Sequence, residues 1–419
     1  MVRSLAAVAA AAAVKVAAQT STTTSEFPFP TDGLPTYNGT GPTMLRFGCH
    51  QLVIDRIDPL VAPGQVPSHH QHQIVGGDAF AATMPSSDIS ALSSCTTCSY
   101  SEDFSNYWTA NLYFRARNGT YKRVPQIPNY SDIFTNDPFI SQTNGGMTVY
   151  YVSPGQNQVT AFPPGFRMFV GDATLRSPPD SPWDLSTQTC FRCFTGPDFE
   201  GDMLRPCLDP AVDTMHLPNK PCWGIRANVL FPTCWDGVNL DSPDHKSHVA
   251  YPVEGPHVFD GIGTAEECPS THPVKIPQVM LEVIWDTTPF NDPDEWPEDG
   301  SQPFVLSTGD PTGYSQHADY IFGWKKDSLQ VAMEAGCFMA NCPGLAVQSV
   351  EQAAQCAVSE LAGDVYDGWL TELPGNPAQP TVSTTTSSAA EPTPTGKGKG
   401  KGDDGKGKHG KRKAKRWSS

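Results

Sequence analysis

The stretch Val279-Met-Leu-Glu-Val-Ile-Trp285 is rich in β-branched and large apolar residues, which is typical of a β-strand. No helical period separates it from the other runs of this kind, which argues against a parallel sheet built from βαβ units. Long loops rich in Pro, Asp and Asn lie between the runs. We therefore expect a mostly β fold, a β-sandwich or jelly-roll-like body with long loops. The other expected strands are Leu52–Ile57, Asn111–Arg115, Met147–Val152, Phe166–Val170, Asn228–Phe231 and Phe304–Leu306.

Composition supports the same fold class. The chain of 419 residues is 38% hydrophobic, enough for a sizeable core, and contains 40 Pro and 36 Gly. These two residue types interrupt helices, so a helical bundle is excluded. One large domain or two medium domains fit this length.

Charge is distributed unevenly. Residues 396–419 hold 10 Lys+Arg and 2 Asp+Glu, while the whole chain has a formal net charge of −16, so the remainder carries −24. An acidic body repels nucleic acid, and we expect no nucleic-acid partner. The basic tail is expected either to bind an acidic polymer or to remain solvated without a partner.

The N-terminus has the pattern of a secretory signal. Arg3 precedes the apolar run Leu5–Val14, and Ala17-Ala18 offers a cleavage site, so residues 1–18 are expected to be a signal peptide. No later run is long enough to span a membrane. The pattern predicts a secreted protein of the extracellular space or cell wall. Three glycosylation sequons, which predict a glycoprotein, agree with this route: Asn38-Gly-Thr, Asn118-Gly-Thr and Asn129-Tyr-Ser.

The chain has 12 cysteines, an even number that fits disulfide bonds in an oxidising compartment. Cys95-x-x-Cys98 and Cys190-x-x-Cys193 also have the spacing of zinc ligands, but disulfides are favoured behind a signal peptide. The cluster Cys337, Cys342 and Cys356 is expected to clip a small helical segment to the body, with one more distant cysteine as a partner.

Five segments follow from these patterns. Residues 327–336 and 346–362 show helical spacing. The Ser/Thr/Pro-rich and Gly/Lys-rich end is expected to be disordered. The expected segments are a signal peptide at 1–18, an irregular arm at 19–42, a β-rich domain at 43–324, a disulfide-clipped helical extension at 325–372 and the tail at 373–419.

His-rich sequence marks the first candidate site. In Ser68-His-His-Gln-His-Gln-Ile-Val-Gly-Gly77, His70 and His72 project to one face of an extended strand. This is the geometry of two metal ligands, or of a base beside a substrate-binding group. A hydrogen-bonded polar cluster at a turn is the structural alternative. Gln73 is assigned to substrate binding with His70.

The second candidate is Cys234-Trp-Asp-Gly through His248. Asp236 is assigned as a catalytic carboxylate, and His245 and His248 would share one face if the segment forms a helical turn. The alternative is an ordinary turn capped by Asp244. The substrate-binding residues expected here are Trp235, Asp244, His245 and His248.

The third candidate is Gly309-Asp-Pro-Thr-Gly-Tyr-Ser-Gln-His-Ala-Asp-Tyr320. His317 and Asp319 share a face on an extended strand, and Asp can orient a His that acts as a base. Tyr314 can donate a proton. The alternative is a turn at Asp310–Gly313 followed by a polar edge strand. The expected catalytic set is His72, Asp236, Tyr314, His317 and Asp319. We predict that one cleft is lined by His70, His72, Asp236, Asp244, His245, His248, His317 and Asp319.

An ordered series of motifs resembles one known family. The series is Arg56-Ile-Asp-Pro59, His70-x-His-Gln-Ile-Val-Gly-Gly77, Ser105-Asn-Tyr-Trp108, Ala161-Phe-Pro-x-Gly-Phe-Arg-Met168, Cys234-Trp-Asp-Gly through His248, and Gly309-Asp-Pro-Thr-Gly-Tyr314. It is similar to the fungal family called domain of unknown function 1996, from about Thr43 to Trp324. The resemblance implies a secreted or wall-associated protein and no settled activity. His69 precedes the matched pair and is left out of the site.

Two functions fit these patterns. The first is a carbohydrate-active enzyme, a glycoside hydrolase using two carboxylates such as Asp236 and Asp319, or a polysaccharide lyase with a His base and Tyr314 as acid. The acidic body favours a neutral glycan as substrate. The second is a non-catalytic glycan-binding or stress-related wall protein whose polar clusters hold Ca²⁺ or sugar hydroxyls. The residue pattern specifies no cofactor and no metal.

Overall fold

The computed structural model describes residues 43–126, 145–153, 159–179, 188–197, 200–202, 206–207, 209, 211–253, 267–339 and 342–375. All of them belong to one compact unit that ends at Gln379. The expected signal peptide, the arm, Asn38, Asn129 and nearly all of the tail lie outside the described residues. None of the described helices has the length and apolarity needed to cross a membrane.

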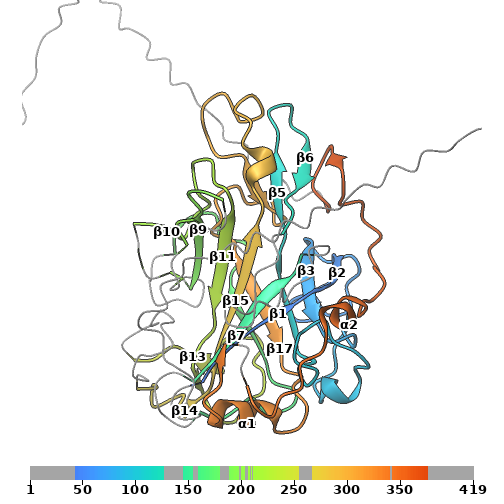
Figure 1. Cartoon of the computed structure of the whole chain (residues 1–419), viewed down its shortest axis with the longest axis vertical. Helices are drawn as coiled ribbons and strands as arrows, with labels where there is room; N and C mark the ends of the chain where they lie inside the picture. Colours follow the sequence, from blue (N-terminus) through green and yellow to red (C-terminus); the bar gives the residue numbers. More distant parts are fainter. Residues whose placement is uncertain are drawn as a thin grey trace, which may run out of the picture. The chain divides into compact units, whose positions relative to one another are not determined.

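The fold is mostly β, as the sequence predicts, and its two larger sheets are antiparallel except for one strand pair. β15, β11 and β9 run side by side in the larger sheet (Figure 1). That sheet has the order β10 (Asp213–Thr214), β9 (Thr189–Cys193), β11 (Ile225–Leu230), β15 (Gln278–Trp285), β7 (Met147–Val152), β1 (Met44–Cys49), β18 (Phe338–Met339). The second has the order β2 (Gln51–Asp55), β3 (His72–Gly76), β4 (Asn106–Ala110), β17 (His317–Ile321), β8 (Arg167–Gly171).

Tyrosine hydroxyls join the two sheets across the core. Tyr151 on β7 donates to Tyr320 on β17 at 2.8 Å, and its oxygen lies 2.6 Å from that of Tyr107 on β4. Tyr107 in turn donates to the buried carboxylate of Asp103 at 2.8 Å. Because side chains alternate along a strand, the residues next to Tyr107 and Tyr320 face away from this core. The candidate site lies on that outer face.

Two smaller sheets extend the ends of the body. One has the order β16 (Phe304–Leu306), β5 (Leu112–Arg115), β6 (Tyr121–Arg123), β19 (Trp369–Leu370), and the other β13 (Val249–Ala250), β12 (Cys234–Trp235), β14 (Val274–Lys275). Single 3-10 turns occur at Ile89–Ala91 and Thr288–Phe290. Asn118 is exposed on the turn between β5 and β6, a position open to a glycan.

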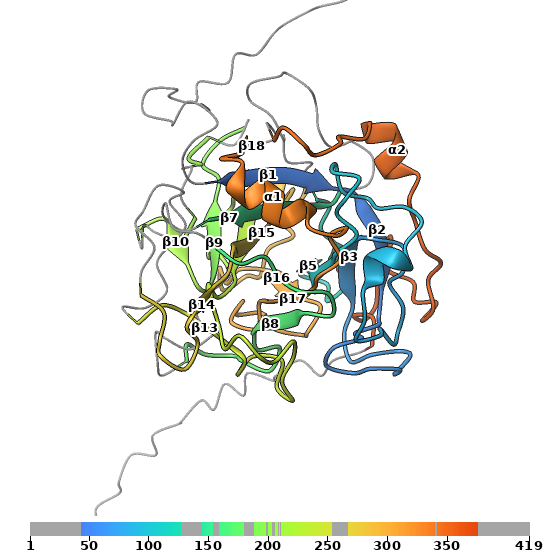
Figure 2. The same cartoon turned by 90° about the horizontal axis from the view of Figure 1, so that it is seen from below.

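Helix is confined to short pieces near the C-terminal end of the described chain. α1 (Ser328–Glu334) agrees with the predicted helical spacing, and Figure 2 shows it beside β1. The longer helix predicted over 346–362 is wrong, because α2 covers only Val350–Ala354. Beyond it, Cys356 is tied to Cys95, and the backbone of Leu361 donates to Asp55 at 2.6 Å. These ties hold the segment in an irregular path across the body.

All 12 cysteines form disulfides, which rules out the alternative of zinc sites at the two Cys-x-x-Cys motifs. Neither motif closes on itself. Cys95 bonds to Cys356, the distant partner that the sequence predicts for the helical extension. The remaining bonds are Cys49–Cys98, Cys190–Cys207, Cys193–Cys222, Cys234–Cys268 and Cys337–Cys342.

We predict that alkylation of the native, unreduced protein labels no cysteine, and that reduction exposes all 12. Mass spectrometry of peptides from the unreduced protein measures both the count and the pairing. Free thiols at Cys95 and Cys356 would contradict the attachment of the extension.

A second prediction concerns Asp103. Burial raises the pKa of Asp103 to about 7, above its ordinary value, despite hydrogen bonds from Ser105 and Tyr107. The native state therefore holds a proton that the unfolded state releases at lower pH, so this group's contribution to stability is lost as pH rises from about 4 to about 7. Asp103→Asn removes the titration. The difference in unfolding free energy, variant minus wild type, should grow in the variant's favour by up to roughly 4 kcal/mol between pH 4 and pH 8. Urea denaturation at both pH values measures it; a constant difference would contradict the assignment.

Candidate functional site

Strand pairing places two histidines in one row across the second sheet. His72 on β3 pairs with Ala110 on β4, and the register of β17 against β4 sets His317 beside the same alanine. Ala110 is buried and has only a methyl group, so the imidazoles on both sides can reach over it. The predicted extended conformation is confirmed for His72 and His317, whereas His70 lies at a bend before β3.

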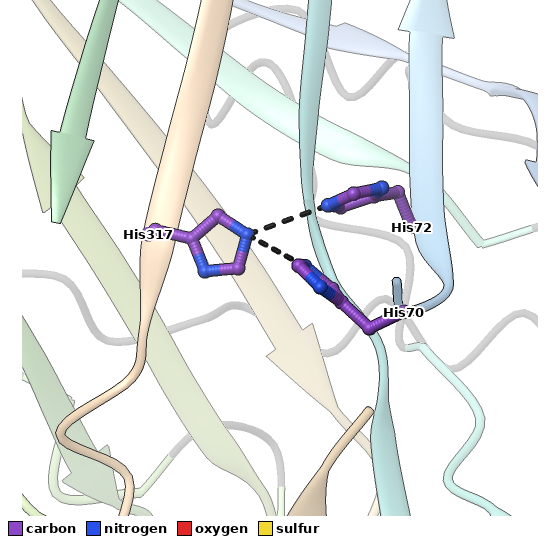
Figure 3. Close-up of side chains that lie close together, drawn as sticks. All are labelled: His70, His72 and His317. Carbon is purple, nitrogen blue, oxygen red and sulfur yellow. Dashed lines mark hydrogen bonds between the residues drawn. The ribbon is translucent and has the colours of Figure 1, made fainter. Parts of the chain in front are cut away.

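His70 lies two residues before His72, the first residue of β3, and completes the cluster. Its Nε2 is 3.0 Å from Nε2 of His317, and Nε2 of His72 is 3.4 Å from the same atom. The three rings point toward one another from the two sides of β4 (Figure 3). We call His70, His72 and His317 the histidine centre.

Backbone carbonyls fix two of the three rings. Nδ1 of His72 lies 3.2 Å from the carbonyl oxygen of Ile57, and Nδ1 of His317 lies 2.7 Å from that of Ser315. A carbonyl oxygen only accepts, so each Nδ1 donates its proton there. The Nε2 atoms of His72 and His317 consequently present lone pairs to the centre.

Burial keeps the three imidazoles neutral. His72 and His317 are almost completely enclosed, and His70 is 9% exposed. Burial lowers the pKa of His72 to about 4. Burial, followed by the neighbouring His72, lowers that of His317 to about 4 as well. At neutral pH the centre therefore offers uncharged nitrogen donors, the form in which histidine binds metal ions.

Two buried carboxyl groups adjoin the centre. Asp319 follows His317 by two residues on β17, and both of its oxygens are buried with no hydrogen-bond partner among the described residues. Burial first, and then the charge of Asp58, raise the pKa of Asp319 well above its ordinary value. Asp58 accepts from the backbone of Leu60 and Val61, at 3.1 and 3.0 Å. The predicted pairing of Asp319 as an orienting partner of His317 is not formed, because Nδ1 of His317 uses a carbonyl.

A loop cation lies over the same face. The ammonium of Lys246 donates to the carbonyl of Gly171 and sits 4.4 Å above the ring of Phe169. Phe169 in turn contacts His317, with ring centroids 5.7 Å apart. The charge of Lys246 opposes the raised pKa of Asp319. The second candidate segment therefore reaches the histidine centre through Lys246.

Residues 58–324 match the family model of the domain of unknown function DUF1996. The match spans more than half of the chain. The chain belongs to the DUF1996 family. Comparisons with curated proteins and with solved structures gave no match.

The DUF1996 range contains the histidine centre and every other residue assigned to the site. It begins at Asp58, beside the centre. β1 and β2 precede the matched range but complete the two larger sheets. The family match therefore covers the candidate site and most of the framework that carries it.

In the second candidate segment, Cys234 to His248, the two assigned carboxylates cap local turns, which is the alternative that the sequence offers to a role in the site. Asp236 accepts from the backbone of Val238 and Asn239, at 2.8 and 2.9 Å. These hydrogen bonds outweigh the effect of burial and lower the pKa of Asp236. Asp244 caps its own turn by accepting from Ser247 at 2.9 Å. Both carboxylates are held as acceptors, which makes them poor proton donors.

The histidines of this segment are held apart by different partners, and the helical turn predicted for them is not formed. Nδ1 of His245 lies 2.6 Å from Asp241, whose hydrogen bond raises the pKa of His245. His248 is buried, with Nε2 2.8 Å from the carbonyl of Arg167. Trp235 is buried as well and donates to the carbonyl of Asn239 at 2.7 Å, so it offers no open stacking surface.

Two further assigned residues have local partners. Gln73 donates to Thr109 at 3.0 Å and, by alternation along β3, points away from the face of His72. Tyr314 is half-buried near His216, with ring centroids 6.4 Å apart. Asp310 forms the expected turn by accepting from Gly313 at 3.0 Å, but the following strand β17 is internal to its sheet and not an edge.

Sequence reasoning gave too little weight to Asp58 and did not consider Lys246. Asp58 stands in Asp55-Arg-Ile-Asp-Pro59, and an Arg between two carboxylates is more often part of a structural ion pair than of a catalytic site. Arg56 instead binds Asp364 with two nitrogens, at 2.5 and 2.9 Å. The signal that could have singled out Asp58 is the following Pro59, because Asp before Pro is typical of the start of a turn, and a turn begins there.

We predict that His248→Ala lowers the unfolding free energy by roughly 2 to 4 kcal/mol, because it removes a buried ring and leaves the Arg167 carbonyl without its partner. Urea denaturation measures the loss. His272→Ala is the matched control, since that imidazole also contacts a carbonyl, of Ser247, but at the surface. An unchanged stability in His248→Ala would contradict the structural role.

Proposed function

We propose that the chain is an extracellular or cell-wall protein, of the fungal kind that its motifs suggest, which acts on a neutral glycan at the histidine centre. The observation that carries this proposal is the collection of three buried, neutral imidazoles on one sheet face, next to the carboxyl groups of Asp58 and Asp319. Burying so many polar groups costs free energy, and a site held for its chemistry accounts for that cost.

The setting supports an extracellular role. Six disulfides are typical of an oxidising compartment, and the exposed sequon at Asn118 is open to glycosylation. The body is acidic, which disfavours acidic polymers and leaves neutral glycans as the favoured class. The basic tail would then retain the protein on acidic wall material.

The geometry favours chemistry at the histidine centre over the two-carboxylate mechanism. Asp236 is committed to its own turn and has a lowered pKa, whereas a glycosidase acid needs a raised one. Neither oxygen of Asp319 has a hydrogen-bond partner among the described residues, and Asp319 shares a strand face with His317. We therefore assign the reaction to the imidazoles with Asp319 beside them.

A non-catalytic glycan-binding function is the second candidate, and one surface feature favours it. Trp369 on β19 is 50% exposed. Phe114 packs against it in an edge-to-face arrangement, with ring centroids 6.3 Å apart, and the ammonium of Lys122 lies over the ring, 5.5 Å from its centre. A tryptophan ring held in place and open to solvent can stack on a sugar.

Incubation with β-glucan, mannan and chitin fragments separates the two functions. An enzyme releases new reducing ends, and His317→Ala should abolish the release while Trp369→Ala leaves most of it. A binding protein is retained on the glycan without product, and Trp369→Ala should weaken the retention about tenfold, the effect of losing one stacking contact of about 1 to 2 kcal/mol.

His216→Ala is the control for loss of an unrelated imidazole, because His216 is exposed and its Nδ1 contacts the carbonyl of Leu217. If the protein releases no product from any of these glycans and is retained on none of them, both candidates are refuted. Product release that survives in His317→Ala would move the reaction away from the histidine centre.

A further inference from the structure

The three imidazoles of the histidine centre have too few ring protons to give every Nε2 atom a hydrogen-bond partner within the centre. The Nε2 atoms of His72 and His317 lie 3.4 Å apart, and both are lone-pair acceptors because each Nδ1 proton is donated to a carbonyl. His70 can supply one proton, from its Nε2 to that of His317 at 3.0 Å. No ring proton then remains for Nε2 of His72. Nε2 of His72 is therefore a buried acceptor that needs a partner, either a hydrogen-bond donor or a metal ion.

The distances suit a metal ion. In a tetrahedral site with Zn–N bonds of about 2.0 to 2.1 Å, neighbouring ligand nitrogens lie about 3.3 Å apart. The two Nε2 separations of 3.0 and 3.4 Å bracket this value. The ligand nitrogens of all three histidines lie within 4.8 Å of one another.

The outer contacts of the rings also follow the pattern of metal-binding histidines. Such residues donate their second ring proton to a carbonyl or carboxylate, which fixes the tautomer and aims the free nitrogen. Ile57 does this for His72, and Ser315 does it for His317. This support is independent of the ring-to-ring distances.

Asp319 and Trp108 supply a further observation. They are direct partners across β17 and β4, and both carboxyl oxygens of Asp319 and the indole nitrogen of Trp108 are buried without a partner among the described residues. Trp108 shares its sheet face with His72, two residues away in the register of β3 against β4. Unsatisfied donors and acceptors beside the centre indicate that a polar group, such as a water molecule bound to an ion, belongs there.

From these observations we propose that His70, His72 and His317 bind one divalent first-row transition metal ion through their Nε2 atoms, with Asp319 facing the coordination position that the protein leaves open. Imidazole ligands suit zinc, copper and nickel. Calcium and magnesium prefer oxygen ligands, so Ca²⁺ is not the expected occupant of this centre. Three protein ligands with one open position is the arrangement of catalytic rather than structural zinc sites.

One other group of described residues meets the same distance criterion, namely Cys49, Cys98 and Asp103. The two sulfurs are joined in a disulfide and cannot bind a metal as thiolates. The histidine centre is therefore the site to test. The metal proposal does not rest on the glycan function, since an ion can bind there whatever the substrate.

The test uses untagged, full-length secreted protein purified without chelator. Elemental analysis should find one transition metal ion per chain in wild type and in His216→Ala, and none above buffer in His317→Ala or His72→Gln. After removal of the metal, Zn²⁺ or Cu²⁺ alone should bind at one site by calorimetry and raise the thermal transition. Ca²⁺ and Mg²⁺ at the same concentration should do neither.

Circular dichroism and intact disulfides establish that each variant is folded. If His317→Ala does not fold, His70→Ala replaces it, because His70 is the most exposed of the three ligands. The proposal is overturned if folded wild-type protein contains no metal and binds neither Zn²⁺ nor Cu²⁺ in the titration. Full metal content in the folded ligand variants would overturn it as well. Metal binding without any glycan activity would refute the proposed function and leave the metal site standing.

Discussion

The pairing of β4 with β3 on one side and β17 on the other determines where every group of the site lies. Ala110 stands between His72 and His317 in this register, and Trp108 stands between Ile74 and Asp319 two residues along. A shift by one residue in either pair would turn these side chains to the opposite face. On the opposite face of this sheet, Tyr107 and Tyr320 contact Tyr151 of the larger sheet. These contacts help to fix the register of β4 and β17.

The outer face is closed by chain that is distant in sequence. Leu60, Phe80 and Met84 pack with Trp108 in a second apolar cluster, and the chain leading to it supplies the Ile57 carbonyl that orients His72. The C-terminal extension is attached to this part of the body by the Cys95–Cys356 disulfide and by the ion pair between Arg56 and Asp364. This cover shields the imidazoles from bulk solvent, which keeps them neutral and makes an unpaired nitrogen costly.

Local pattern was enough to predict the fold class, and it singled out the three histidines of the candidate site. The apolar runs at Met147–Val152 and Val279–Trp285 became β7 and β15, and alternation correctly set His72 and His317 on extended chain. The helix predicted from the spacing over 346–362 is wrong over most of its length. The Cys95–Cys356 disulfide and the hydrogen bond from Leu361 to Asp55 override helix propensity there. The sequence could not show that β3 and β17 flank one strand, because that depends on tertiary pairing. The turn capped by Asp244 is one of the alternatives that the sequence offers, and it is the one that forms. The single cleft expected for the histidines and carboxylates of the three candidate segments stays a prediction.

The account depends on an ion between the three imidazoles. An anomalous difference map from crystals of the untagged protein, measured on both sides of the absorption edge of the metal found by elemental analysis, tests this most directly. We predict one strong peak about 2.0 to 2.1 Å from Nε2 of each of His70, His72 and His317, with a non-protein ligand on the side of Asp319. A centre that contains only water, or rings turned so that Nε2 atoms no longer face one another, would contradict it.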